Sequence, residues 1–229
     1  MAEIYAGVPA ILKFCKPSRR PLPDSFHPVS SSTPSLSAIV LAAGRSSRMR
    51  TLKALLPWKG TSLIRFQTET LLNAGISDIV VVLGFRAADL SNELSSYTIK
   101  TVMNKDYHSG KCSSIKAGLA AVTQPSSGVI ICAVDQPLSL NVVRNLYKLH
   151  TKHPAAIILP SFKGKRGHPL LIPKSLYDDL QDIKEQTQGL RHLVNTRRKE
   201  IVTVELDEPS ILLNLNEQAD YQEACWEDS

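Results

Sequence analysis

The sequence predicts an α/β fold in which helices cover both faces of a doubly wound, mostly parallel sheet. Short, uninterrupted apolar runs recur along the chain, which is typical of strands buried on both faces. Segments with helical periodicity separate these runs, and alternation of this kind is the pattern of a parallel α/β sheet. The 229 residues suffice for one such domain with a short extension.

Residues 1–36 are predicted to form a disordered N-terminal extension, and residues 37–229 the single domain. Prolines are frequent among the serines of residues 17–37, so this stretch cannot form a regular helix or an inner strand. The basic start of the chain raises the alternative of a targeting peptide, but an apolar core followed by a small-residue cleavage site is missing from it. A plain tail is the favoured interpretation.

The apolar runs predict four buried strands in the first two thirds of the domain. They comprise residues 38–43, 78–83, 129–134 and 155–159. Because parallel α/β sheets bind ligands at the carboxyl ends of their strands, a site is expected where these runs end.

Helices are predicted between the runs from residues that repeat on one face. Residues 112–122 carry Ile115, Leu119 and Val122 in register, and a later segment repeats an apolar face from Leu140 to His150. After residue 159 the pattern loosens. Apolar pieces at residues 169–172, 201–206 and 211–215 are expected to add a small antiparallel edge beside the ligand site.

The charge and the cysteine spacing of the chain disfavour several classes of function. The formal net charge is +6, from 27 basic and 21 acidic residues, which suits an anionic substrate. A dense basic stripe with interleaved aromatics is missing, so a nucleic-acid partner is not expected. The widely separated cysteines lack the spacing of zinc or iron–sulfur ligands and favour a reducing, cytoplasmic compartment. No apolar run reaches the length of about 20 residues that spans a membrane.

The most specific motif directly follows the first predicted strand and reads Leu-Ala-Ala-Gly-Arg-Ser-Ser-Arg-Met over residues 41–49, with Lys53 four residues later. Small residues allow backbone N–H groups to approach phosphate oxygens. The basic side chains add positive charge. The spacing of a Walker loop is missing. The residues assigned to nucleotide binding here are Leu41, Ala42, Ala43, Gly44, Arg45, Ser46, Arg48 and Lys53.

This motif resembles the LAAGxSxRMxxxK signature of the MobA-like nucleotidyltransferases. The resemblance extends over residues 37–224 and implies a three-layer, Rossmann-like fold of the nucleotide-diphospho-sugar transferase type. It implies that the loop wraps the triphosphate of a nucleotide, with Arg48 and Lys53 as catalytic cations. Further segments match in the same order, and they add Leu83, Gly84, Asn104, Ser113 and Ser114 to the nucleotide site.

Asp135 is the predicted metal ligand. It stands just beyond the third apolar run, where a carboxylate can hold a hard cation that bridges phosphate oxygens. The alternative role, a helix N-cap, is one that Ser139 can also fill. The resemblance implies Asn216 as the second ligand, Mg²⁺ as the cofactor and Mn²⁺ as its substitute. Two departures from the family pattern lie nearby, Asn214 for a common Asp and residues 217–218 for Thr-Pro.

The acceptor side is assigned to residues that match two other family segments. The residues are Gly167, His168 and Pro169, from a segment like GxRGHP, and Arg191, from one like GLR. Basic residues at positions 163–166 can neutralise a phosphate group, although a solvated basic loop is the alternative.

The expected reaction is attack by an acceptor phosphate monoester on the α-phosphorus of a nucleoside triphosphate, with release of pyrophosphate. The Ala-Ala-Gly form resembles the branch of the family that joins CTP to molybdopterin, a phosphorylated pterin. A molybdenum enzyme or its chaperone is then a candidate protein partner. Three alternatives stay open: a pyrophosphorylase for another phosphorylated acceptor, a non-catalytic accessory protein of a molybdenum enzyme, and a dinucleotide-dependent oxidoreductase. The oxidoreductase is disfavoured because the first turn lacks GxGxxG.

Overall fold

The computed structural model describes residues 35–46, 49, 51–123 and 125–227. Of the predicted extension, only Ser35 and Leu36 belong to this part, and Leu36 already begins the first strand. The rest of the extension lies outside the described residues, and so does Arg48, which belongs to the loop predicted to bind phosphate.

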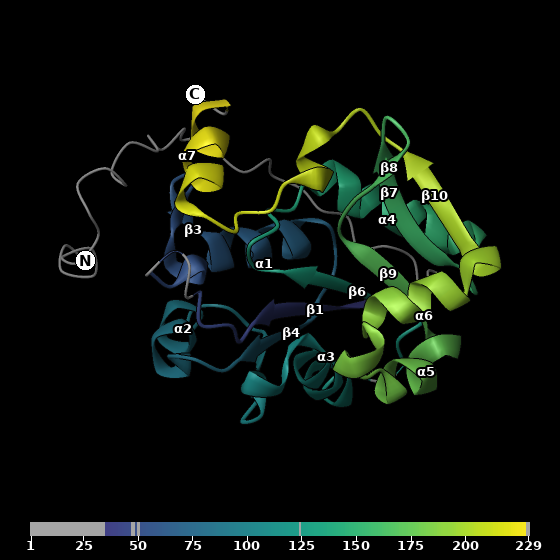
Figure 1. Ribbon diagram of the computed structural model, residues 1–229, viewed down its shortest axis with the longest axis horizontal. Helices are drawn as coiled ribbons and strands as arrows, with labels where there is room; N and C mark the ends of the chain where they lie inside the picture. Colours follow the sequence, from purple (N-terminus) through teal and green to yellow (C-terminus); the bar gives the residue numbers. More distant parts are fainter. Residues whose placement is uncertain (1–34, 47–48, 50, 124, 228–229) are drawn as a thin grey trace.

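The described residues form an eight-stranded sheet with the order β10-β7-β9-β6-β1-β4-β5, in which β8 pairs with β7 (Figure 1). Strand β1 pairs in parallel with both β4 and β6, and β4 pairs in parallel with β5. A separate two-stranded antiparallel sheet joins β2 to β3. The predicted mostly parallel α/β fold with a small antiparallel addition is confirmed. The strands are β1 (Leu36–Ala42), β2 (Pro57–Trp58), β3 (Thr61–Ser62), β4 (Asp78–Leu83), β5 (Lys100–Met103), β6 (Gly128–Ala133), β7 (Ile157–Phe162), β8 (Lys165–Arg166), β9 (Leu170–Pro173) and β10 (Ile201–Glu205).

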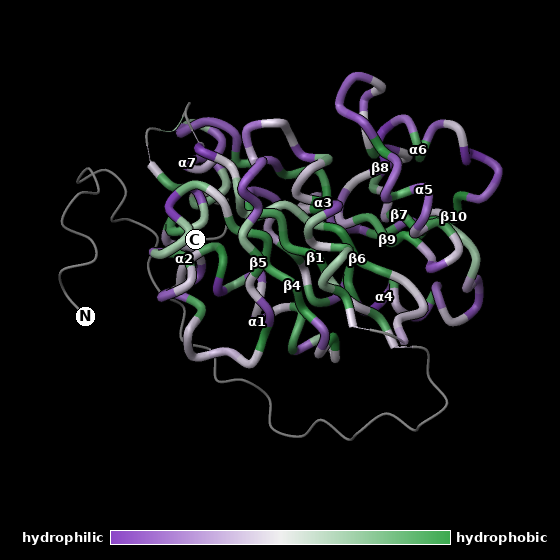
Figure 2. Tube along the Cα trace, turned by 90° about the horizontal axis from the view of Figure 1, so that it is seen from below, coloured by the Kyte–Doolittle hydropathy of each residue, from purple (hydrophilic) through white to green (hydrophobic). Residues whose placement is uncertain are grey.

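Successive side chains of the central strands pack on opposite faces of the sheet, and each face has its own apolar core. In β1, Ala38 and Val40 belong to the core that includes residues of α1, α2, α4 and α7, whereas Ile39 belongs to the core under α3, α5 and α6. Figure 2 shows β1, β4 and β6 as the hydrophobic centre between these helices. The helices are α1 (Leu63–Asn73), α2 (Ala87–Glu93), α3 (Lys111–Ala120), α4 (Leu140–Lys152), α5 (Tyr177–Asp182), α6 (Leu190–Thr196) and α7 (Gln218–Glu227).

The predicted helical faces are buried as expected. In α3, Ile115 and Leu119 are buried in the core. In α4, the buried positions are Val142, Val143, Leu146 and His150, so the face is centred slightly to one side of the predicted one.

The segments after residue 159 do not form the single antiparallel edge that the sequence predicted. Strand β9 is antiparallel to both β6 and β7 and lies between them, inside the sheet. Strand β10 lies at the edge but is parallel to β7. Residues 209–212 form a 3₁₀ helix, not a strand. Apolar content alone indicated strands here, but it carries no information on pairing partners, which depend on contacts distant in sequence.

The order in which the strands are added to the sheet reverses next to β1, which is parallel to both of its neighbours. From β1 the chain moves to β4 and β5 on one side, and β6 then lies on the other side of β1. The carboxyl ends of β1 and β6 therefore meet at the switch point of the sheet, where open α/β folds bind ligands. Within the described part of the chain, no helix has the length and apolar character needed to cross a membrane.

Candidate active site

A cleft of about 290 Å³ opens at the carboxyl ends of β1 and β6. The first predicted loop, Lys53 and Asp135 all line it, together with the start of α3. The lining residues are Leu41, Ala42, Ala43, Gly44, Ser46, Leu52, Lys53, Ala54, Tyr107, Gly110, Lys111, Ser114, Ala133, Val134 and Asp135. The fold thus brings together residues that are up to 94 positions apart between Leu41 and Asp135.

The loop after β1 is open on its outer side at Gly44. A Cβ atom added to Gly44 would meet nothing within 4 Å, so this stretch of backbone is accessible from the cleft. Ser46 has a positive φ of 52°, and its Oγ accepts a hydrogen bond of 3.2 Å from the backbone N–H of Lys53. This contact ties the loop after β1 to the 3₁₀ helix Lys53–Leu55.

Leu83 and Gly84 support the loop from the neighbouring strand. Leu83 is buried, and a Cβ atom on Gly84 would lie 2.7 Å from the carbonyl oxygen of Ala43 and 2.8 Å from the Cγ of Tyr107. Only a glycine allows these chain segments to lie so close together. The exposed Arg45 guanidinium lies 5.8 Å from the ring centroid of Phe85 and 5.9 Å from that of Tyr107.

Asn104 organises the start of α3. It is buried, and its side-chain amide donates hydrogen bonds to Ser113 Oγ at 2.9 Å and to Ser114 Oγ at 3.0 Å. Its backbone N–H donates to the carbonyl oxygen of Leu83 at 2.8 Å. Of these residues, Ser114 lines the cleft itself. The structure therefore places Asn104 as a support of the two serines.

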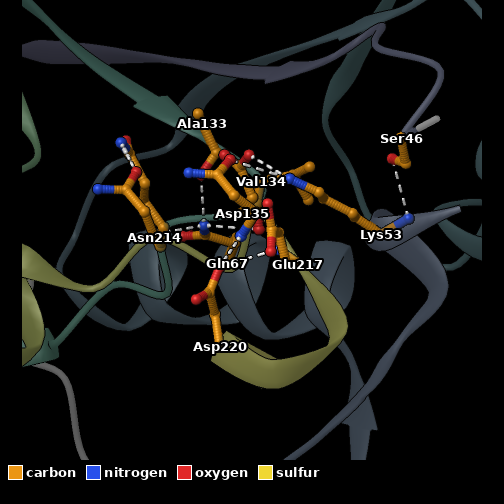
Figure 3. Close-up of polar contacts among 11 residues, drawn as sticks. Ser46, Lys53, Gln67, Ala133, Val134, Asp135, Asn214, Glu217 and Asp220 are labelled. Atoms are coloured by element: carbon orange, nitrogen blue, oxygen red, sulfur yellow. Dashed lines mark hydrogen bonds and ion pairs between the residues drawn. The ribbon is translucent and has the colours of Figure 1, made fainter. Parts of the chain in front are cut away.

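The turn that carries Asp135 is held from below by Gln67, a fully buried residue of α1. The Gln67 side-chain amide donates hydrogen bonds to the carbonyl oxygens of Ala133 at 2.9 Å, Val134 at 3.4 Å and Gln136 at 2.8 Å (Figure 3). These contacts supply a side-chain donor to carbonyl groups where β6 ends, and the Ala133 oxygen also accepts from the backbone N–H of Gln136 at 3.0 Å. They fix the backbone on both sides of Asp135.

Lys53, Asp135 and Asn216 form the polar centre of the site, of which Figure 3 labels Lys53 and Asp135. The buried Lys53 donates from Nζ to Asp135 Oδ2 at 2.9 Å and to Asn216 Oδ1 at 3.2 Å. The two predicted metal ligands thus converge on one cation, although they are far apart in sequence. Carboxylate and amide oxygens are the ligands that Mg²⁺ and Mn²⁺ prefer, so this donor set fits such an ion.

The segment that carries Asn216 is anchored to the turn of Asp135. The backbone N–H of Leu215 donates to the carbonyl oxygen of Asp135 at 2.8 Å, and Gln136 Nε2 donates to Asn214 Oδ1 at 2.6 Å. The carboxylate of Asp220 accepts hydrogen bonds from the backbone N–H groups of Asn216 and Glu217, at 2.9 Å and 2.8 Å. Asn214, the departure from the family pattern, is thus engaged in joining the two segments.

The described residues supply few metal donors beyond this pair. Among them, no group of three or more His, Cys, Asp or Glu side chains is arranged to hold a metal ion. A cation bound by Asp135 and Asn216 would take its other ligands from phosphate oxygens and water, as is usual for Mg²⁺ at nucleotide sites.

The predicted acceptor residues Gly167, His168, Pro169 and Arg191 do not line the cleft. A Cβ atom on Gly167 would lie 2.4 Å from the carbonyl oxygen of Ile211, and the backbone N–H of His168 donates to that same oxygen at 2.9 Å. Burial lowers the pKa of His168 below the usual 6.5; the charge of Lys111 lowers it further, and that of Asp135 opposes this. His168 is therefore electrostatically close to the polar centre. Pro169 is buried, and Arg191 is exposed on α6.

Sequence reasoning assigned no individual role to Tyr107, Gly110, Lys111 and Gln67, although Gly110 and Lys111 belong to the segment that resembles the family pattern after Asn104. The first three stand between the matched Asn104 and Ser113, so the motif region already contained them. Gln67 had a weaker signal, a polar residue on the apolar face that Leu63, Ile64 and Leu71 share in α1. Such a residue often marks a buried hydrogen-bonded side chain.

Two characterised relatives match a large part of the chain. Nicotine blue oxidoreductase of Paenarthrobacter nicotinovorans is 34% identical over 152 residues, which are 62% of this chain and 73% of that protein. Molybdenum cofactor cytidylyltransferase of Escherichia coli (strain K12) is 27% identical over 192 residues, which are 81% of this chain and 93% of that protein.

Solved structures agree on the fold. Rv0371c of Mycobacterium tuberculosis H37Rv superposes with a TM-score of 0.74 at 22% identity, over 85% of this chain and 100% of that one. The same protein has also been solved in complex with manganese. The model of the MobA-like NTP transferase domain matches residues 38–202. With the signature loop in the cleft, the sheet order and this match in agreement, the chain belongs to the MobA-like NTP transferase domain family.

Proposed function

We propose that this protein transfers CMP from CTP to the phosphate group of molybdopterin and releases pyrophosphate, with Mg²⁺ as the cofactor and Mn²⁺ as its substitute. One observation carries the proposal. A loop of small residues with open backbone at Gly44 and the polar centre of Lys53, Asp135 and Asn216 lie at the same cleft, which suits a polyphosphate beside a divalent cation.

In this proposal, each group of site residues binds a different part of the substrate or the cation. The backbone of Ala43 and Gly44 faces the phosphates, and Arg48 and Lys53 balance their negative charge. Asp135 and Asn216 hold the cation, which when bound stabilises charge on the phosphoryl oxygens. Ser113 and Ser114, on the support of Asn104, border the nucleotide, as do Leu83 and Gly84.

The bond that forms joins an acceptor phosphate oxygen to the α-phosphorus of the nucleotide, and the bond that breaks joins that phosphorus to the oxygen leading to the β-phosphate. A phosphate monoester, with a second pKa near 6, is largely a dianion at neutral pH and needs no strong general base. His168, whose pKa is lowered by burial, is neutral there and can orient the acceptor by hydrogen bonding.

The choice of CTP and molybdopterin is supported by the Ala-Ala-Gly sequence of the loop and by the 27% identical Escherichia coli cytidylyltransferase. A molybdenum enzyme or its chaperone is the proposed recipient of the product. Pyrophosphate release tests the proposal, measured with CTP, GTP and ATP in turn, in the presence of Mg²⁺ and molybdopterin and against a reaction without acceptor. Release with CTP that depends on molybdopterin is expected. A preference for GTP would contradict the nucleotide assignment, and binding without turnover would favour an accessory protein.

A second candidate is an oxidoreductase, because the 34% identical relative carries that name. The missing GxGxxG turn therefore does not exclude redox activity within this family. The two candidates separate in one parallel assay, in which NADH and NADPH replace the nucleoside triphosphate and their oxidation is followed by absorbance with pterin and quinoid acceptors. We expect no acceptor-dependent oxidation. Oxidation that survives Asp135→Asn, together with no pyrophosphate release, would favour the oxidoreductase.

A further inference from the structure

Lys53 occupies the space between the two residues proposed to bind the cation. Its Nζ lies 2.9 Å from Asp135 Oδ2 and 3.2 Å from Asn216 Oδ1, and the residue is only 9% exposed. An ammonium group that donates to both oxygens fills the position that a divalent ion bound by the same two oxygens would need. Both cannot be there together, because a metal ion approaches its oxygen ligands to about 2.0–2.1 Å and is repelled by a neighbouring positive charge.

The side chain of Lys53 can leave while its backbone stays. The backbone N–H is held by Ser46 Oγ, and the carbonyl oxygen accepts from the N–H of Leu56 at 3.0 Å. The four-carbon stem beyond Cα is flexible. Lys53 lines the same cleft as Gly44 and Ser46, so an alternative partner for the ammonium is at hand when a polyphosphate occupies that loop.

We propose that Lys53 is a built-in competitor of the metal: it holds Asp135 and Asn216 in the free protein and leaves them when nucleotide phosphates offer it another partner. Without nucleotide, the divalent cation must displace Lys53 and therefore binds weakly. With nucleotide bound, Lys53 has another partner and the cation binds well. This inference rests on the proposed nucleotidyl transfer, and it adds an order to the assembly of the site. The coupling is reciprocal, so metal also favours nucleotide binding.

A permanent structural ion pair is the competing interpretation. In that case Lys53 positions the two oxygens in every state, and its removal weakens metal binding or leaves it unchanged. Only the competition between Lys53 and metal predicts tighter metal binding when Lys53 is removed, so direct titration separates the two interpretations.

The first experiment titrates Mn²⁺ alone into the full chain and follows free Mn²⁺ by electron paramagnetic resonance, without nucleotide. The variant is Lys53→Met, which keeps the stem and removes the charge. We expect its Kd for Mn²⁺ to fall by at least about tenfold, because the ion no longer displaces two charge-assisted hydrogen bonds.

Two control variants isolate the cause. Lys111→Met removes a positive charge that lines the same cleft without a hydrogen bond or ion pair to Asp135 or Asn216, and it should tighten binding by no more than about threefold. Lys152→Met, at the exposed end of α4, should leave the Kd unchanged. Weaker or unchanged Mn²⁺ binding by Lys53→Met would overturn the proposal, as would equal tightening by Lys111→Met.

The second experiment uses the unaltered protein, so it does not depend on the folding of a variant. An amine-acylating reagent labels the lysines, and mass spectrometry of peptides compares Lys53 with Lys152 before and after saturating Mg²⁺. Since Mg²⁺ expels the buried ammonium, we expect the relative labelling of Lys53 to rise severalfold. Constant or reduced labelling at saturating Mg²⁺ would refute the displacement.

These outcomes are independent of turnover. If no nucleotide is ever transferred but both metal results hold, the proposed function fails and the competition between Lys53 and metal stands. If pyrophosphate is released but Mn²⁺ binds the unaltered protein and Lys53→Met equally well, the competition fails and the proposed function stands.

Discussion

Replacing Gly44 by alanine tests whether the loop after β1 receives the phosphates. A Cβ atom at this position meets nothing within 4 Å, and the backbone there does not adopt a positive φ. The variant should therefore fold normally. The added methyl group stands, however, on the accessible side of a loop that lines the cleft, where the proposal places phosphate oxygens against backbone N–H groups.

The expected magnitudes follow from this geometry. Gly44→Ala should change the free energy of unfolding by no more than about 1 kcal/mol, with a small gain if the unfolded chain loses freedom. Loss of one charge-assisted hydrogen bond to phosphate should raise the Kd for CTP by about 10- to 100-fold. Gly84→Ala is the matched control. Its Cβ would lie 2.7 Å from the Ala43 carbonyl oxygen, so we expect a loss of about 1–3 kcal/mol and a Tm lower by about 3–10 °C.

The assay combines calorimetric titration of CTP in the presence of Mg²⁺ with thermal unfolding of the same samples. Binding of CTP by Gly44→Ala with the affinity of the unaltered protein, at an unchanged Tm, would show that this loop does not contact the phosphates. A large fall in Tm for Gly44→Ala would instead contradict the open space around this residue.

Three further perturbations test the rest of the site. Asp135→Asn should lower pyrophosphate release by about 100-fold or more while Tm stays within a few degrees, and retained activity would remove Asp135 from the reaction. Gln67→Met should remove the side-chain donor from the carbonyl groups of Val134 and Gln136 and cost about 1–3 kcal/mol in urea unfolding; a loss below about 0.5 kcal/mol would contradict their support by Gln67. Burial lowers the pKa of both His150 and His168 below 6.5, so the unfolded chain takes up protons first and the unfolding free energy should fall as pH decreases from about 7 to about 5. The double replacement by Gln should flatten this slope, and an unchanged slope in urea titrations would assign it to other groups.

Local pattern was sufficient to predict the central strands and the small-residue loop that follows β1. The run at residues 78–83 coincides with β4, since a strand covered on both faces must be apolar throughout. Strand β5 was not predicted, because Lys100 to Met103 lie at the sheet edge and alternate between partly buried and exposed positions. The position of β9 between β6 and β7 was also beyond prediction, since pairing depends on partners distant in the chain.

The sequence by itself determined the class of the fold, the small-residue loop and the identity of the polar residues at strand ends, because these depend on neighbours in the chain. Only the tertiary structure decided that Lys53, Asp135 and Asn216 share one hydrogen-bonded centre, and that a buried Gln67 secures it. The physical reason is that a site of this kind is built from three chain segments that are far apart in sequence and meet at the carboxyl ends of central strands. The distances between them are set by strand order and by packing of helices on both faces.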